Sequence, residues 1–301
     1  MKLTILGCYS ATPRAFTNPT AQVLDVKGNL FLIDCGEGTQ VQLRKFKIKF
    51  SRIKHVFVSH LHGDHFFGLI GLISTFRLLG REAALHVYGP KGIKEVILLQ
   101  LKLGNSYGGY ELIFHELVSK ESELIFEDDK VSVYTIPLVH RVYTNGFLFK
   151  EKLGERKLDI NAVLNYNIEQ CDYRNIKLGK DVVNIKGVLI KNALISSDPE
   201  PPKSYAFCSD TKYTETIIPI IKEVTALYHE STFLEEHAHL CKKTKHSTAK
   251  EAATIALKAN VDKLILGHFS TRYGTIKCFK EEAKEVFNKV LLADDGKEFE
   301  F

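Results

Sequence analysis

Short apolar runs alternate with longer segments of helical periodicity in the first third of the chain. Four runs rich in Val, Ile, Leu and Phe are bounded by Gly, Pro, Asn or Asp, which is typical of strands: residues 2–7, 21–26, 30–34 and 55–59. The sequence at 25–29 predicts a hairpin turn. Apolar positions at helical spacing predict a helix over 64–79, and further strands are expected at 85–88, 112–116 and 131–138.

The last third repeats this alternation. Strands are expected at 205–209, 226–229, 263–266 and 290–293, the last being the final element. Helices are expected through Ile217, Ile218 and Ile221, at 247–259 with a capping box of Thr248 and Glu251, and at 279–288. Two similar halves, each a mixed sheet with helices outside, predict an α+β protein whose two sheets pack face to face.

The segment from 150 to 203 differs from both halves. It carries many charged and polar residues with few clear periods, and it closes with the rigid extended stretch 197–202. One interpretation is a surface insertion that only connects the halves. We favour a functional segment, because long irregular segments inside compact domains usually serve function or motion.

Composition narrows the class of protein. The 301 residues are 45% hydrophobic, which is enough for a large core in one or two domains, and the net charge of +5 permits a polyanionic partner without requiring one. No apolar stretch reaches the ~18 residues of a membrane span, and residues 1–7 resemble a strand and not a signal peptide. Six scattered cysteines without a C-x-x-C pair indicate free thiols in a reducing cytoplasm.

The strongest chemical signal lies at the corner between the predicted strand 55–59 and the helix that follows it. His60, His62, Asp64 and His65 fall within six residues there, and imidazole and carboxylate groups are the ligands that zinc and similar ions accept. The alternative is a histidine-rich surface loop. We favour a metal site, because four ligand-type residues share one strand end.

Three distant residues occupy equivalent places. His140, Asp210 and His268 each lie just beyond the C-terminal end of a predicted strand, where functional residues commonly gather. Taken alone, each of these residues is better explained as a helix cap or a solvent-exposed polar group than as a metal ligand. Their shared placement predicts that they complete the metal site.

The pattern His60-x-His62-x-Asp64-His65 with these three residues resembles the metallo-β-lactamase superfamily, which implies a four-layer αββα sandwich with two metals at one sheet edge. The resemblance narrows to the ribonuclease Z family, whose members cut the 3′ trailer from precursor tRNA. It rests on motifs at 35–40, 59–65, 207–211, 229–233, 246–249 and 268–273, in family order from residue 3 to about 290.

The resemblance implies a role for each site residue. Two zinc ions per subunit are expected, although manganese suits the same ligands. Asp64 would also accept or orient a proton of the attacking water. His246 would contact the scissile phosphate or protonate the leaving oxygen, and Glu230 would fix its tautomer; the alternative for His246 is a cap of the following helix. The implied ligands are His60, His62 and His140 for one metal, Asp64, His65 and His268 for the other, and Asp210 between them.

Substrate contacts are implied as well. The chain is expected to be a single domain, 1–301, in which 150–203 contains an arm that grips the tRNA elbow of a substrate held by the other subunit of a homodimer. The sequence departs from the family pattern at 169–172, in the arm, and at 12–18. Arg272, Lys243 and Lys245 are candidate RNA contacts. The basic run 44–54 would either track phosphates or form a solvated helix end.

These features predict a zinc-dependent endoribonuclease that leaves a 3′-hydroxyl on the tRNA, with no membrane partner. One alternative keeps the fold and changes the substrate to a small phosphodiester or ester. Another alternative, of a different class, is a non-catalytic RNA-binding module.

Overall fold

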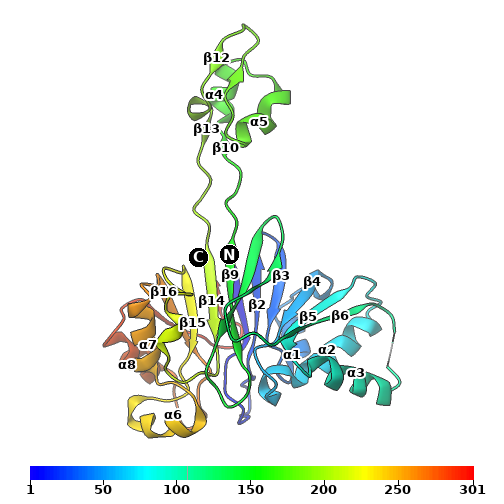
Figure 1. Ribbon diagram of the computed structural model, residues 1–301, viewed down its shortest axis with the longest axis vertical. Helices are drawn as coiled ribbons and strands as arrows, with labels where there is room; N and C mark the ends of the chain where they lie inside the picture. Colours follow the sequence, from blue (N-terminus) through cyan, green and yellow to red (C-terminus); the bar gives the residue numbers. More distant parts are fainter. Residues whose placement is uncertain (107) are drawn as a thin grey trace. The chain divides into compact units, whose positions relative to one another are not determined.

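The computed structural model describes residues 1–106 and 108–301, and within them two seven-stranded sheets lie face to face (Figure 1). In the first sheet β3, β4, β5 and β6 run parallel, so their C-terminal ends share one edge. In spatial order this sheet contains β18 (Glu298–Glu300), β1 (Lys2–Gly7), β2 (Ala21–Val26), β3 (Asn29–Ile33), β4 (Ile53–Phe57), β5 (Leu85–Pro90) and β6 (Leu112–Leu117).

The second sheet also combines parallel and antiparallel pairs. Its strands β14 to β17 run parallel, and β9 pairs antiparallel with β14. In spatial order it contains β17 (Val290–Leu292), β16 (Lys263–Gly267), β15 (Ala226–Glu230), β14 (Ser204–Cys208), β9 (Asn145–Glu151), β8 (Val131–Pro137) and β7 (Leu124–Glu127).

Helices cover the outer face of each sheet (Figure 1). The first sheet carries α1 (Thr39–Lys45), α2 (Gly63–Leu78) and α3 (Ile93–Leu103), and the second carries α7 (Ala249–Lys258) and α8 (Lys277–Lys284); α6 (Ala238–Thr244) lies before α7. Buried Phe31, Phe57, Phe147 and Phe207 fill the space between the sheets. The chain therefore has the four-layer αββα sandwich that the sequence predicted.

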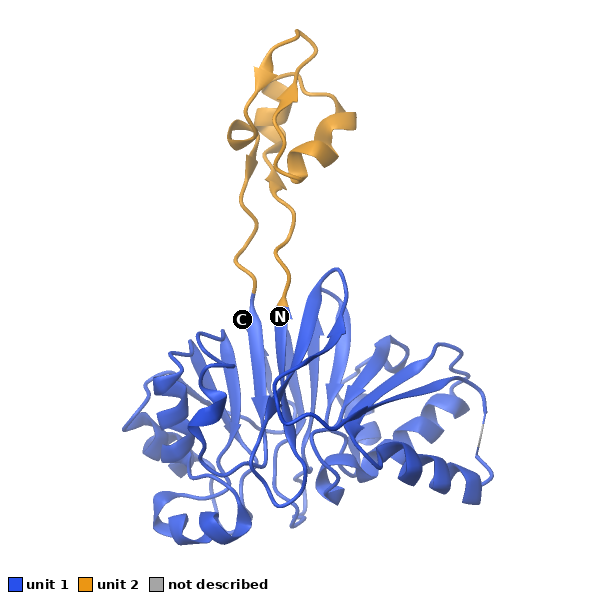
Figure 2. Ribbon diagram, viewed as in Figure 1, with its two compact units in different colours: residues 1–150, 203–301 blue, residues 151–202 orange. Residues whose placement is uncertain are grey.

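The chain divides into two compact units, residues 1–150 with 203–301 and residues 151–202 (Figure 2). The second unit has a small apolar core of its own, formed by Val163, Ile168, Ile176, Val182, Ile190 and Ile195. It contains β10 (Lys157–Leu158), α4 (Ile160–Asn165), α5 (Tyr173–Lys177), β11 (Val182–Val183), β12 (Leu189–Ile190) and β13 (Ser196–Ser197). The polar segment 150–203, which differs from both halves in sequence, thus contains a unit that folds around buried aliphatic residues.

Several local predictions are confirmed. The turn between β2 and β3 has positive φ at Lys27 and Gly28, as a two-residue hairpin turn requires, and Val26 pairs with Asn29. Helix α7 begins with the predicted capping box. Within the described residues, no helix is long and apolar enough to cross a membrane.

Three predicted elements are wrong in extent. In place of a helix through Ile217 to Ile221, the structure has one 3₁₀ turn, η4 (Glu215–Ile217), because Pro219 lacks the N–H that a continuing helix needs. Helix α8 ends at Lys284, short of residue 288. The strand at 290–293 is not the final element, since β18 follows and pairs with β1.

Candidate metal and phosphodiester site

All seven predicted metal ligands converge at one edge of the sandwich. Four strands deliver them from their C-terminal ends, because β4, β8, β14 and β16 all end at this edge. His60 and His62 follow β4, Asp64 and His65 open α2, His140 follows β8, Asp210 follows β14, and His268 follows β16.

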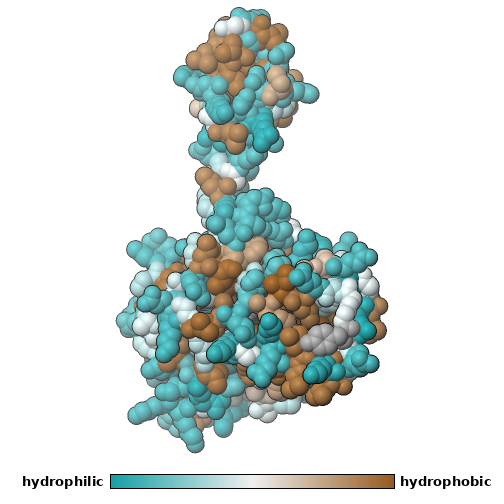
Figure 3. All heavy atoms as spheres, turned by 45° about the vertical axis from the view of Figure 1, so that its right-hand side comes forward, coloured by the Kyte–Doolittle hydropathy of each residue, from teal (hydrophilic) through white to brown (hydrophobic). Residues whose placement is uncertain are grey.

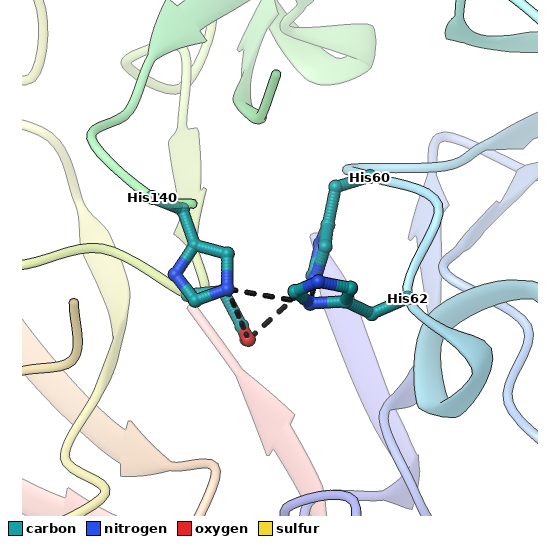
Figure 4. A group of neighbouring side chains, drawn as sticks. His60, His62 and His140 are labelled. Carbon is teal, nitrogen blue, oxygen red and sulfur yellow. Dashed lines mark hydrogen bonds and ion pairs between the residues drawn. The ribbon is translucent and has the colours of Figure 1, made fainter. Parts of the chain in front are cut away.

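The first ligand group is a close set of imidazoles (Figure 4). His60 Nε2 lies 3.0 Å from His62 Nδ1, and His140 Nε2 lies 3.3 Å from the same His62 nitrogen. These three histidines and Asp210 present ligand atoms that all lie within 4.8 Å of one another. The second group, within the same limit, contains Asp64, His65 and His268.

Asp210 links the two groups through its separate carboxylate oxygens. Its Oδ1 lies 3.2 Å from both His65 Nε2 and His268 Nε2. Its Oδ2 lies 3.6 Å from His60 Nε2 and 3.8 Å from His140 Nε2. One buried carboxylate therefore offers one oxygen to each group, which is the arrangement of a bridging ligand.

Buried polar groups orient the first imidazoles from behind. Asp34 Oδ2 accepts from His65 Nδ1 at 2.7 Å, and the same carboxylate accepts from the Ser59 backbone N–H and hydroxyl. The Ser59 hydroxyl also lies 3.0 Å from His60 Nδ1. Each ring is thereby held with Nε2 toward the site, as supporting partners of metal-bound histidines do.

The other rings are held in the same way. The Lys245 carbonyl lies 3.0 Å from His140 Nδ1, and the Thr232 hydroxyl lies 2.9 Å from His268 Nδ1. Sequence reasoning missed these orienting groups, including Asp34. A signal for Asp34 was present, because it ends a predicted strand beside the one that leads to His60.

The charge states of His60 and Asp210 suit a cation. Burial, together with neighbouring histidines, holds the pKa of His60 well below its usual value, so this imidazole is neutral and its lone pair is free. Burial opposes ionisation of Asp210, but His268 and His65 outweigh it and hold the pKa of Asp210 well below its usual range.

Two buried nitrogen atoms indicate whether the site can hold an ion. His65 Nε2 and His268 Nε2 are buried without a hydrogen-bond partner, and both face Asp210. Orphaned buried nitrogens are costly unless something binds them. Imidazole and carboxylate ligands at this spacing fit a centre for divalent cations.

The backbone is strained at three site residues. Asp34, Asp210 and His268 have φ of 56°, 57° and 57°, in the left-handed region that costs non-glycine residues about 1 kcal/mol or more. Asp34 and His268 directly follow β3 and β16, and Asp210 lies two residues after the end of β14. The positive φ turns each of these side chains toward the site, so the backbone strain occurs where the side chain must face the other site residues.

A charged pair lies beside the ligands. His246 Nδ1 is 2.8 Å from Oε1 of the fully buried Glu230. Burial opposes the charge on the imidazole, but the Glu230 carboxylate overrides it and raises the pKa of His246 to about 9. The N-cap of α7 is Thr248, so His246 does not cap that helix.

The ligands open onto a cleft of about 580 Å³. Arg272, a candidate RNA contact from the sequence, lines this cleft, and Arg141, which was not among the candidates, lines it too. The side chains of Lys243 and Lys245 are not among its lining residues. The basic run 44–54 contributes to a different hollow of about 560 Å³.

Comparisons with known proteins agree with this geometry. Residues 1–154 match the family model described as Anti-Pycsar protein Apyc1. A protein named Ribonuclease Z from Bacteroides fragilis is 44% identical over 98% of this chain and 97% of its own length. Its namesake from Porphyromonas gingivalis is 44% identical over 97% and 96%.

Two solved structures also resemble the chain over its whole length. The short form of human tRNase Z matches with a TM-score of 0.73 and 26% identity, covering 100% of this chain and 99% of that chain. The metallo-β-lactamase fold protein YhfI from Bacillus subtilis matches in fold, with a TM-score of 0.71, 18% identity, and coverage of 100% and 99%. The chain has the metallo-β-lactamase fold, its first 154 residues fit the Apyc1 family model, and over nearly its whole length it belongs to the ribonuclease Z family.

Proposed function

We propose that this hydrolase of the ribonuclease Z family is a zinc-dependent endoribonuclease that removes the 3′ trailer from precursor tRNA. The observation that carries the proposal is Asp210, whose two oxygens face two separate ligand groups in a chain 44% identical to ribonuclease Z along its length. Two cations held side by side suit in-line displacement at phosphorus.

Two zinc ions per subunit would be held by the two ligand groups. His60, His62 and His140 would bind one ion, Asp64, His65 and His268 the other, and Asp210 both. The bound ions would supply acidified water and positive charge at the phosphate near neutral pH. Manganese is the second candidate, because it accepts the same ligands.

The side chains around the ligands have defined tasks in this proposal. Asp64 would accept or orient a proton of the attacking water. Attack on phosphorus breaks the bond to the 3′ oxygen of the tRNA, and His246 would protonate that oxygen to leave a 3′-hydroxyl. Glu230 would position His246, since its buried carboxylate holds Nδ1 and leaves Nε2 for the substrate.

RNA contacts beyond the metal ligands would come from two places. Arg272 in the cleft wall, with Lys243 and Lys245 near His246, would meet phosphates. The unit at 151–202 would act as the arm that binds the tRNA elbow within one domain, 1–301. Its support is that the unit folds around an apolar core of its own and exposes Lys177, Lys180 and Lys186, which can meet phosphates, together with the apolar surface seen in Figure 3.

A homodimer is part of the proposal. Helices α2 and α3 expose Phe67, Leu78, Leu99 and Leu103, and an exposed apolar face of this kind fits a second copy of the chain. All six cysteines are free thiols, which is consistent with a reducing cytoplasm.

The test is cleavage of a precursor tRNA with a 3′ trailer by the zinc-loaded protein, with Asp64→Ala beside it. We expect one cut near the base that precedes the trailer, a free 3′-hydroxyl on the tRNA, and loss of both in the variant. If the metal-loaded protein binds the RNA without cutting it, the chain is an RNA-binding module. If the protein neither binds nor cuts the RNA but hydrolyses a small phosphodiester or ester, the proposed substrate is wrong.

A further inference from the structure

The loop between β1 and β2 carries an unusual aromatic residue beside the cleft. Phe16 is fully exposed, at 101% of its reference surface, and its φ is 68°. Among the described non-glycine residues with positive φ, Phe16 is the one with an apolar side chain. Both the exposure and the backbone conformation oppose this residue type.

Local contacts fix the conformation of this loop. The Thr17 N–H and hydroxyl both donate to the Arg14 carbonyl, at 3.4 and 3.3 Å, and close a turn in which Phe16 is the third residue. A positive φ at the third position is where such turns normally have glycine. The Tyr9 N–H donates to the Asn18 carbonyl at 3.2 Å and closes the base of the loop.

The same loop forms part of the cleft wall. Ser10, Ala11 and Thr12 line the 580 Å³ cleft, and they also line an adjoining hollow of about 320 Å³. Arg14 Nη1 donates to the Tyr273 carbonyl at 3.0 Å, which ties the loop to the segment that contains Arg272. Phe16 itself lines neither hollow, but Pro13 and Thr17, which precede and follow it, line the adjoining one, so Phe16 stands on a tethered turn at the rim of that hollow.

From this position we propose that Phe16 is a stacking platform for an unpaired base of the RNA substrate next to the scissile bond. An exposed ring pre-positioned on a fixed turn suits a flat apolar partner, and proteins bind unpaired bases by stacking them on aromatic rings. Strained residues that persist at a site edge are often retained for binding. The proposal rests on the proposed function, because it requires an RNA substrate.

A cycle between protein and substrate tests the contact. The zinc-loaded protein and Phe16→Ala are each measured on precursor tRNAs in which single nucleotides flanking the cut are intact or abasic. We expect Phe16→Ala to raise KM by roughly 5- to 50-fold with little change in kcat. One abasic position should weaken the wild type similarly and leave Phe16→Ala unaffected, because the stacked pair is already lost.

Two further variants separate the ring from the backbone. Phe16→Tyr keeps an aromatic ring and should retain the wild-type KM. Phe16→Gly removes the ring and relieves the positive φ, so its KM should match that of Phe16→Ala while its urea midpoint exceeds that of Phe16→Ala. The matched control is Leu257→Ala, an exposed apolar truncation on α7, which should change neither quantity.

The outcomes distinguish the two proposals. If the wild type cuts precursor tRNA and Phe16→Ala cuts it with the same KM, the stacking contact is wrong and the proposed function stands. Additive effects of Phe16→Ala and every abasic position would also overturn the contact. If the wild type fails to cut precursor tRNA, both proposals fail.

Discussion

Asp210 is the side chain that faces both proposed ligand groups. Its oxygens lie 3.2 Å from His65 Nε2 and 3.6 Å from His60 Nε2, and it is almost fully buried. Asp210→Ala should abolish phosphodiester cleavage and lower the metal content measured by mass spectrometry below two ions per subunit. Removal of a buried anion also leaves the surrounding imidazoles without their shared partner.

A surface aspartate provides the control for that measurement. Asp262→Ala removes an exposed carboxylate that pairs with Lys289 and should leave metal content and activity unchanged. Retention of two ions and full activity by Asp210→Ala would refute its bridging role.

Asp34 allows a finer test, because it contacts His65, a proposed ligand, without itself belonging to either proposed ligand group. Asp34→Asn keeps the size of the side chain and removes the negative charge that faces His65 Nδ1. We expect metal affinity to fall by roughly 10- to 100-fold, measured by competition with a chelator. An unchanged affinity would show that the Asp34 charge is not needed to orient the ring.

His246 separates chemistry from binding. His246→Ala should lower kcat by roughly 10²- to 10⁴-fold on precursor tRNA, because the leaving oxygen loses its proton donor. The RNA dissociation constant, measured with calcium in place of a catalytic metal, should change much less. A loss confined to binding would move His246 out of the chemistry, and Glu230→Gln should show a weaker form of whichever defect appears.

Residue types and strand ends were enough to predict the seven residues that the structure brings together. Thr232 was missed because a buried threonine that orients a ring carries no pattern that separates this task from ordinary packing. Asp34 was missed although its place at the end of a predicted strand, beside the strand that leads to His60, was a usable signal. Lys243 and Lys245 were chosen for their closeness to His246 in sequence. Their side chains do not line the cleft, although Thr244 and His246, the neighbours of Lys245, do.

At the scale of elements, the start of α7 can be tested directly. Thr248 Oγ1 accepts from the Glu251 N–H at 3.1 Å, and the Glu251 side chain accepts from the Thr248 N–H at 2.9 Å. Thr248→Ala should lower the free energy of unfolding by about 0.5–2 kcal/mol in urea titration. Lys250→Ala, at a half-exposed position in the first turn of the same helix, should cost less, and an equal loss would mean that the cap contributes nothing specific.

Strong alternation or helical spacing was required for an element to be predicted. Helix α1 (Thr39–Lys45) has only seven residues, and five of its side chains are polar or charged, so no apolar face appears over its length. Strand β9 contains Gly146, which sequence reasoning treats as a breaker. In the structure this glycine is needed, because a Cβ there would lie 2.2 Å from the Phe207 carbonyl oxygen of β14.

At the scale of the whole molecule, the insertion at 151–202 is the part whose hydrophobic pattern predicted the least structure. Its core of six aliphatic residues is too small to produce clear periods in 52 residues, and its elements are only two to six residues long. What the sequence did supply was the place of the insertion, between the two halves. The pairing of β9 with β14 explains why a segment can be inserted there without disturbing either sheet.

That pairing also makes the insertion removable. Lys150 and Ser204 are directly paired in the antiparallel ladder, so an Asn-Gly turn can replace 151–203 and close a hairpin between β9 and β14. The shortened protein should keep its metal and hydrolyse a small phosphodiester at the wild-type rate. Its affinity for precursor tRNA should fall by roughly 10²-fold, because a linked second contact is lost. Equal loss on both substrates would make the insertion structural, whereas unchanged cleavage of precursor tRNA would mean that the cleft alone selects the RNA.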